Sequence, residues 1–163
     1  LAVLDLPHPF ARQAWGGWLA TFAVLYAFLR LHEGELPRWA TTATHVGAAW
    51  LAVALLCWES GWRIDRIVAG EGTWPFVAWA LVPGAALLAL TAGIGRERWP
   101  LGAHRRTYAV LAAAPVALYL WLWLFVANAV SDGDAAPLPY VPVLNPLDLA
   151  CLAVLVAIAW WYV

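Results

Sequence analysis

The sequence contains few charged residues, and it has no lysine and no methionine. Only 12% of its 163 residues are charged and 64% are hydrophobic, whereas about 25% of the residues in a typical soluble domain are charged. This shortage of charge excludes an ordinary water-soluble domain and indicates a protein embedded in a lipid membrane. The net charge of -1 also excludes the strongly basic surface that nucleic-acid binding requires. We therefore expect no nucleic-acid partner.

The common catalytic and cofactor-binding motifs are also missing. The sequence has no H-E-x-x-H, no C-x-x-C, no Walker loop, no G-x-S-x-G and no G-x-G-x-x-G. Its two cysteines, Cys57 and Cys151, lie inside apolar stretches, and neither their number nor their spacing implies a disulfide framework. The sequence therefore provides no ground for a metal, haem or nucleotide cofactor, and it favours a non-enzymatic protein over an enzyme.

Five apolar stretches fill most of the chain, and each approaches the roughly 20 residues that cross a bilayer as a helix. The thirteen tryptophans gather mostly at the ends of these stretches, as in an aromatic belt. We predict an all-α, polytopic transmembrane helix bundle in which residues 1–163 form a single region. Because the sequence starts at Leu1, we expect a longer protein whose remaining transmembrane helices and membrane lipids are the partners. The predicted spans are 15–31, 40–58, 76–95, 108–130 and 147–163.

Two spans contain helix-breaking residues, and both also carry small residues at four-residue spacing. Pro83-Gly84 near the middle of the third span and Pro115 in the fourth should free backbone carbonyls, and Pro83 should kink its helix. The small residues indicate either faces for close helix packing or simply the abundance of alanine. They are Ala85, Ala89 and Gly93 on the third span, and Ala109, Ala113 and Ala117 on the fourth.

The distribution of arginine predicts the orientation, because cytoplasmic connections are enriched in basic residues. If the first residue lies outside, six arginines fall on the inner side and three on the outer side. The connection between the last two spans supports this orientation, since it carries Asp132 and Asp134 and no arginine. We predict an outer N-terminus and an inner C-terminus. The inner arginines are Arg30, Arg38, Arg96, Arg98, Arg105 and Arg106, and the outer ones are Arg12, Arg63 and Arg66.

Five polar side chains near the outer span ends form the main candidate site. Polar groups at membrane depth are costly and usually face a cavity or a partner. Each also has a structural interpretation. The run 145–148, Asn-Pro-Leu-Asp, has the residue order of a helix start with a capping box, and the spacing of 59 and 63 fits a helical ion pair. The candidates are Glu59, Arg63, Asn128, Asn145 and Asp148.

Two histidines lie toward the inner side. His45 follows three threonines at the start of the second span and is either a satisfied structural histidine or a proton relay. His104 stands beside Arg105 and Arg106, a group that we expect to contact anionic lipid headgroups.

Several short motifs distributed over nearly the whole chain resemble one known family. The most specific is the run 137–150, with the sequence PLPYVPVLNPLDLA. The weaker ones are Pro7-His8-Pro9, Trp58-Glu59 with Trp62, Trp99-Pro100 and Asp132-Gly133. Together they resemble the DUF2339 family of predicted bacterial membrane proteins. The resemblance implies a large inner-membrane protein with more than five spans, and it supplies no catalytic residues.

Three functions remain open at this point. The leading hypothesis is an integral inner-membrane protein that binds lipid or an envelope component in an outer-leaflet cavity. A portion of a transporter is the first alternative, with helix breaks at Pro83 and Pro115 and a coupling site at Asp148. The second alternative is an envelope glycosyltransferase-like or acyltransferase-like enzyme with Glu59 or Asp148 as base.

Overall fold

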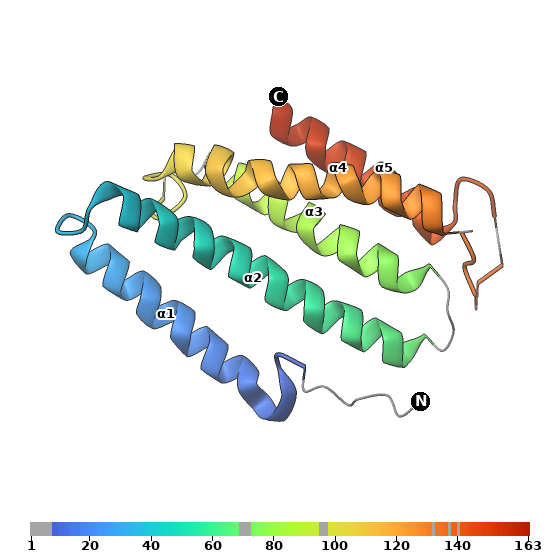
Figure 1. Cartoon of the computed structure of the whole chain (residues 1–163), viewed down its shortest axis with the longest axis horizontal. Helices are drawn as coiled ribbons and strands as arrows, with labels where there is room; N and C mark the ends of the chain where they lie inside the picture. Colours follow the sequence, from blue (N-terminus) through green and yellow to red (C-terminus); the bar gives the residue numbers. More distant parts are fainter. Residues whose placement is uncertain (1–7, 69–72, 95–97, 132, 137, 140) are drawn as a thin grey trace.

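Long antiparallel helices make up the fold (Figure 1). The computed structural model describes residues 8–68, 73–94, 98–131, 133–136, 138–139 and 141–163. Every regular element in those ranges is helical, which confirms the predicted all-α class. The five long helices are α1 (Ala14–His32), α2 (Arg38–Ile67), α3 (Trp74–Ile94), α4 (Ala113–Val130) and α5 (Pro146–Tyr162). A short 3-10 helix η1 (Ala11–Gln13) precedes α1, and a π-helix η2 (Thr107–Ala112) runs into α4.

Four helical segments of the described chain are long and apolar enough to cross a membrane. They are Ala11–His32, Arg38–Ile67, Phe76–Gly93 and Thr107–Val130. The fifth helix, α5, is equally apolar but has 17 residues, so it falls just short of the same length. The structure thus has the helices of a multi-pass membrane protein. Gly95, where the third span was expected to end, lies outside the described residues.

Helix α2 extends well beyond the stretch expected from hydropathy. The sequence predicted an end at Trp58, whereas the helix continues to Ile67. Its last turns carry an ion pair between Arg63 Nε and Glu59 Oε1, 2.6 Å apart, which spans one turn and stabilises helical backbone where the apolar run has ended. Hydropathy follows the membrane-spanning part of a helix, so it misses such a polar extension.

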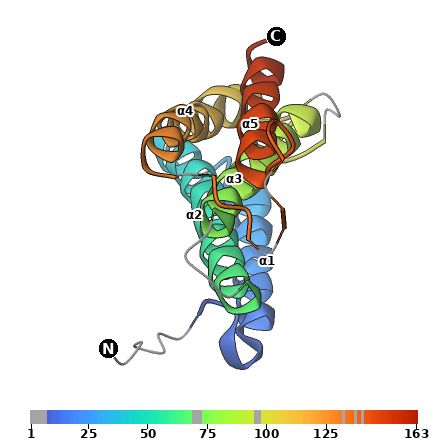
Figure 2. The same cartoon turned by 90° about the vertical axis from the view of Figure 1, so that its right-hand side faces the viewer.

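Helix α3 lies at the centre and packs against α2, α4 and α5, with α4 and α5 at one end of the molecule in Figure 2 and α1 at the other. The face that α3 buries is not the predicted one: Ala85 and Ala89 are exposed, while Ala80 and Leu87 are fully buried. On α4 the predicted face does enter the core. The small core residues there and on α5 are Ala113, Ala117, Ala127, Ala150 and Ala157, which let the helices approach closely.

Helix α1 is the least buried element. Leu29 is its only buried side chain, and large apolar side chains such as Leu19 and Val24 remain exposed along it. Within the helix, the Tyr26 hydroxyl contacts the Tyr108 hydroxyl at 3.2 Å. Further polar contacts lie just beyond its two ends, where Glu33 meets His104 and where the segment before the helix meets Glu59. The exposed apolar face is that of a helix surrounded by lipid or by further helices.

A neighbouring helix satisfies the backbone group that Pro83 leaves free, and indoles also bond to the backbone of the segment before Pro115. Helix α3 runs through Pro83 as one helix, but proline has no N–H to donate to the carbonyl of residue 79 one turn earlier. The hydroxyl of Tyr119 on α4 donates to that Trp79 carbonyl instead, at 3.0 Å. Before Pro115, in η2, the indoles of two tryptophans donate to backbone carbonyls: Trp50 to Ala112 at 3.1 Å and Trp161 to Ala109 at 2.7 Å. Backbone groups freed inside a membrane need such partners.

Candidate functional site

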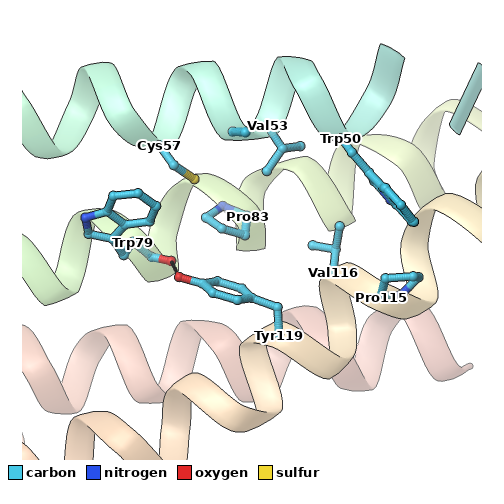
Figure 3. Close-up of a pocket in the computed structure, with 9 residues that line it drawn as sticks. Trp50, Val53, Cys57, Trp79, Pro83, Pro115, Val116 and Tyr119 are labelled. Atoms are coloured by element: carbon cyan, nitrogen blue, oxygen red, sulfur yellow. Dashed lines mark hydrogen bonds between the residues drawn. The ribbon is translucent and has the colours of Figure 1, made fainter. Parts of the chain in front are cut away.

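An apolar groove lies between α2, α3 and α4 at the depth of the membrane-spanning segments. It has a volume of about 290 Å³ and opens to the side of the bundle. Figure 3 shows side chains from the three helices meeting around it, with the hydroxyl of Tyr119 directed at the backbone of Trp79. The lining residues are Trp50, Val53, Ala54, Cys57, Trp79, Pro83, Pro115, Val116 and Tyr119.

The groove arises where the two prolines occur. Pro83 on α3 and Pro115 on α4 have short, compact side chains, and both line the groove. The polar atoms of two neighbouring aromatic residues are already engaged, because Tyr119 donates to the Trp79 carbonyl and Trp50 donates to Ala112. These two side chains therefore present mainly their ring faces to the groove. A molecule that fits here is apolar.

Glu59, the first of the predicted site residues, anchors the N-terminal segment on the end of α2. Its side chain is 5% exposed, and its carboxylate accepts hydrogen bonds from Arg63 Nε at 2.6 Å and from the Phe10 N–H at 3.2 Å. His8 Nδ1 lies 2.6 Å from the same carboxylate, and the His8 ring stacks on Trp62. The contacts with His8 and Phe10 therefore dock this segment, the contact with Arg63 stabilises α2, and none of these groups lines the groove.

Asn145 and Asp148 together form the start of α5. The Asn145 side-chain oxygen accepts a hydrogen bond from the Asp148 N–H at 2.9 Å, so Asn145 is the N-cap that its sequence position indicates. The Asp148 carboxylate accepts from the Asn145 amide at 2.7 Å and from the Val143 N–H at 3.0 Å. A capping box would bond to the N–H of the cap residue, whereas this carboxylate bonds to a backbone N–H two residues earlier.

Asn128 makes a third, separate set of contacts. Its amide donates to the Leu124 carbonyl in its own helix at 2.8 Å and reaches Cys151 Sγ on α5 at 3.5 Å. In the described part of the chain, the contacts of the five predicted residues thus fall into three groups, around Glu59, Asn145 and Asn128. They share one end of the bundle, but the hydrogen bonds do not join them into a single cluster.

A denser polar cluster lies at the opposite end, where α1 ends, α2 begins and the chain turns into η2. It consists of Glu33, His45 and His104, and we refer to it as the histidine cluster. His104 Nε2 lies 2.9 Å from Glu33 Oε2, His45 Nε2 lies 3.8 Å from the same oxygen, and the two imidazole centroids are 4.4 Å apart. One potential ligand atom from each residue lies within 4.8 Å of the others.

The Glu33 carboxyl is held in its ionised form. Burial alone would raise its pKa, but hydrogen bonds from His104 and Trp99, and the nearby imidazoles, outweigh burial and lower the pKa below its ordinary value. The indole of Trp99 donates to the same carboxylate oxygen at 3.4 Å. The cluster therefore contains an anionic carboxylate that can bind a cation.

A chain of hydrogen bonds fixes His45 from behind. Its ring is fully buried, and Nδ1 lies 2.8 Å from the Tyr108 hydroxyl, which lies 3.2 Å from the Tyr26 hydroxyl. Its other nitrogen, Nε2, faces Glu33 and has no hydrogen-bond partner among the described residues. The Nδ1 side of the His45 ring is thus held by a hydrogen bond to Tyr108, whereas Nε2 lacks a hydrogen-bond partner in the described part of the chain.

Sequence reasoning identified His45 and placed His104 near lipid headgroups, but it did not connect them with Glu33 or Tyr108. Glu33 and His104 are 71 positions apart, and His45 and Tyr108 are 63 positions apart. The available signal was topological: with alternating spans, all of these residues fall at one membrane face. Hydropathy predicts the membrane face at which a residue lies, but it does not predict which residues are neighbours at that face.

Comparison with known proteins identifies the family alone. No curated protein and no solved structure matches this chain. Among the residues on which the resemblance depends, Pro7, Asp132, Pro137 and Tyr140 lie outside the described residues. The family model described as a predicted membrane protein, DUF2339, matches residues 1–163, so the chain belongs to the DUF2339 family of predicted membrane proteins.

Proposed function

We propose that this chain is part of a multi-pass protein of the bacterial inner (cytoplasmic) membrane that binds the acyl chain of a membrane lipid in the groove between α2, α3 and α4. The observation that carries the proposal is the groove itself, an apolar slot of about 290 Å³ that opens sideways at the depth of the bilayer core. Such a volume lies at the lower end of the range for ligand pockets, about 300–1,000 Å³.

The size and position of the groove favour an acyl chain. A helix with its side chains is about 10–12 Å wide, so a whole helix does not fit into a groove of about 290 Å³. If the groove were empty, the atoms of its wall would lose dispersion contacts with no compensating gain in free energy. A flexible hydrocarbon chain from the adjacent bilayer supplies those contacts without conformational change in the protein.

On α2 and α3 the groove extends from the middle of the spans toward the end of the bundle that carries Glu59, and on α4 it lies at the middle of the span. Its α2 residues run from Trp50 to Cys57, and Glu59 follows one half-turn later on another face of the helix. With the orientation predicted from arginine, this is the outer half of the membrane, so the bound lipid belongs to the outer leaflet. The residues of the Glu59 group are engaged with the N-terminal segment and do not supply a headgroup site.

The transporter and envelope-enzyme alternatives have less support. Both depend on Glu59 or Asp148 as a working carboxylate, and each of these is engaged in contacts that hold local structure. The leading hypothesis is therefore non-enzymatic lipid binding at this site.

Photocrosslinking with a phospholipid that carries a diazirine in its acyl chain tests the proposal. Ala54 is exposed in the groove wall, so Ala54→Phe fills the slot with a ring. We expect the variant to reduce crosslinking to groove residues severalfold, because the ring occupies the space of the acyl chain. Crosslinked residues are identified by peptide mass spectrometry.

A matched control is Ala23→Phe on the exposed face of α1, which lines none of the cavities described above. It should leave crosslinking in the groove unchanged. Crosslinking that is no denser at the groove than along α1, or that Ala54→Phe does not reduce, would overturn the proposal and indicate that a side chain from another helix of the protein fills the slot.

A further inference from the structure

The histidine cluster has the composition of a transition-metal site. Two imidazoles and one carboxylate are the ligands of many zinc and iron sites, whereas calcium and magnesium prefer shells made of oxygen. Glu33, His45 and His104 come from three separate segments of the chain, yet their ligand atoms lie within 4.8 Å of one another. The convergence of three such groups from distant positions needs an explanation beyond general surface polarity.

The spacing of the ligand atoms suits a small divalent ion. Zinc binds imidazole nitrogen and carboxylate oxygen at about 2.0–2.2 Å in a tetrahedron, so its ligand atoms lie about 3.3–3.6 Å apart. The Glu33 oxygen lies 2.9 Å from His104 Nε2 and 3.8 Å from His45 Nε2, which brackets that spacing. All three ligand atoms lie within 4.8 Å of one another, so a bound ion would draw the most widely separated ones closer together.

His45 supplies an independent observation. Its Nε2 is completely buried, points toward Glu33 and has no partner in the described part of the chain. A buried polar atom without a partner is energetically unfavourable, and a bound ion removes that cost. On the far side of the ring, Tyr108 and then Tyr26 form the outer hydrogen-bonded shell that usually orients a metal-binding histidine.

A cavity adjoins the cluster and leaves room for one more ligand. It has a volume of about 370 Å³, and Thr41 forms part of its wall. The buried Thr41 hydroxyl has no hydrogen-bond partner among the described residues. Three protein ligands and one open position are typical of catalytic rather than purely structural zinc sites. The cavity residues are Glu33, Gly34, Arg38, Thr41, Thr42 and His104.

We propose that Glu33, His45 and His104 bind one divalent transition-metal ion of the zinc class, with its open coordination position facing the cavity that contains Arg38 and Thr41. The ligand at that position is water or a small anionic group, because Arg38 and the metal both carry positive charge. This site lies at the opposite end of the bundle from the Glu59 group, and it does not depend on lipid binding in the groove.

Metal stoichiometry and affinity test the proposal. The intact protein is purified in detergent with a tag that contains no histidine, stripped with a chelator and titrated with Zn²⁺ by calorimetry, with elemental analysis of the complex. We expect one high-affinity equivalent and a rise in the thermal unfolding temperature, because an ion that binds only the folded state stabilises it. Glu33→Gln and His104→Gln should each lower the affinity by at least about 10-fold, since even the loss of an outer-shell partner costs about 10–100-fold.

Two further variants separate metal binding from general stability. His32→Gln removes an exposed histidine at the same end of the bundle, where His32 contacts Glu35, and should leave zinc affinity unchanged. Tyr108→Phe keeps the three ligands but removes the bond to His45, so it should weaken binding about 10-fold. Binding that is absent in the native protein, or that neither Glu33→Gln nor His104→Gln weakens, would overturn the proposal.

Discussion

The amide of Asn145 holds the start of α5 in two ways. Its oxygen accepts the Asp148 N–H, and its nitrogen donates to the Asp148 carboxylate, which also receives the Val143 N–H. Val143 has a φ of 71°, in the left-handed region that disfavours a β-branched residue. The bond to Asp148 therefore helps to hold an unfavourable backbone conformation in the turn before the helix.

Asn145→Ala should lower the free energy of unfolding by about 1 kcal/mol, because it removes the acceptor for a helix N–H. Thermal unfolding of the protein in detergent, followed by circular dichroism, measures the effect. Asn145→Ser, which restores a capping oxygen, should recover most of the loss. The control is Asn128→Ala on the exposed side of α4, with an effect within about 0.5 kcal/mol. An Asn145→Ala protein as stable as the native one would show that the cap contributes nothing.

At the residue scale, the sequence predicted the cap because capping depends on neighbours within four positions. The role of Glu59 was only partly predictable. Its pairing with Arg63 follows from their spacing on a helix, whereas its contacts with His8 and Phe10 join positions about 50 residues apart. Only the folded chain determines such a contact.

At the scale of helices, Pro83 replaces a hydrogen bond within α3 by one between α3 and α4. Pro83 has no N–H for the Trp79 carbonyl, and Tyr119 of α4 supplies the donor. The sequence indicated which backbone would be freed. It did not indicate that an α4 tyrosine would bond to it, since that depends on how α3 and α4 pack.

A double-mutant cycle on Pro83 and Tyr119 measures this exchange. Tyr119→Phe should destabilise the protein, because the Trp79 carbonyl then lacks a partner inside the membrane. In a protein with Pro83→Ala, residue 83 has an N–H that can donate to this carbonyl within the helix. The two changes together should therefore cost less than their sum, with a coupling of about 0.6 to 1.7 kcal/mol, the average and maximum found for such bonds in membranes.

The measurement is reversible unfolding of the four proteins in mixed micelles. Tyr26→Phe is the matched control for Tyr119→Phe, since the Tyr26 hydroxyl contacts Tyr108 rather than a freed carbonyl. Its combination with Pro83→Ala should be additive. Additivity for Pro83→Ala and Tyr119→Phe as well would mean that the hydroxyl does not replace the missing backbone donor.

At the scale of the whole molecule, the two ends of the bundle differ in chemistry. One end has the histidine cluster with Arg38, Arg105 and Arg106, and the other has the Glu59 group and the α4–α5 connection. Figure 1 shows the connection between α1 and α2 at the same end as the segment before α4. The positive-inside rule predicts that this arginine-rich end faces the cytoplasm. Arg96 and Asp132, which entered that argument, lie outside the described residues.

Labelling of introduced cysteines determines the orientation. In a background without Cys57 and Cys151, Asp134→Cys should react with a membrane-impermeant maleimide added to intact cells, because the α4–α5 connection is predicted to lie outside. Ala103→Cys, which is exposed at the other end, should react only after the cells are permeabilised. The opposite pattern would reverse the orientation and place the lipid groove in the inner half of the membrane.

The sequence by itself determined the class of this protein: an all-helical membrane protein, its approximate spans, the start of α5 and the positions of the broken backbone. These features follow from hydropathy, helix length and capping, which depend on residues close together in the chain. The tertiary structure alone decided that Glu33, His45 and His104 meet, and that Trp50, Pro83 and Tyr119 surround one groove. Such sets arise from the rotation and registry of packed helices, and no local pattern in the sequence contains that information.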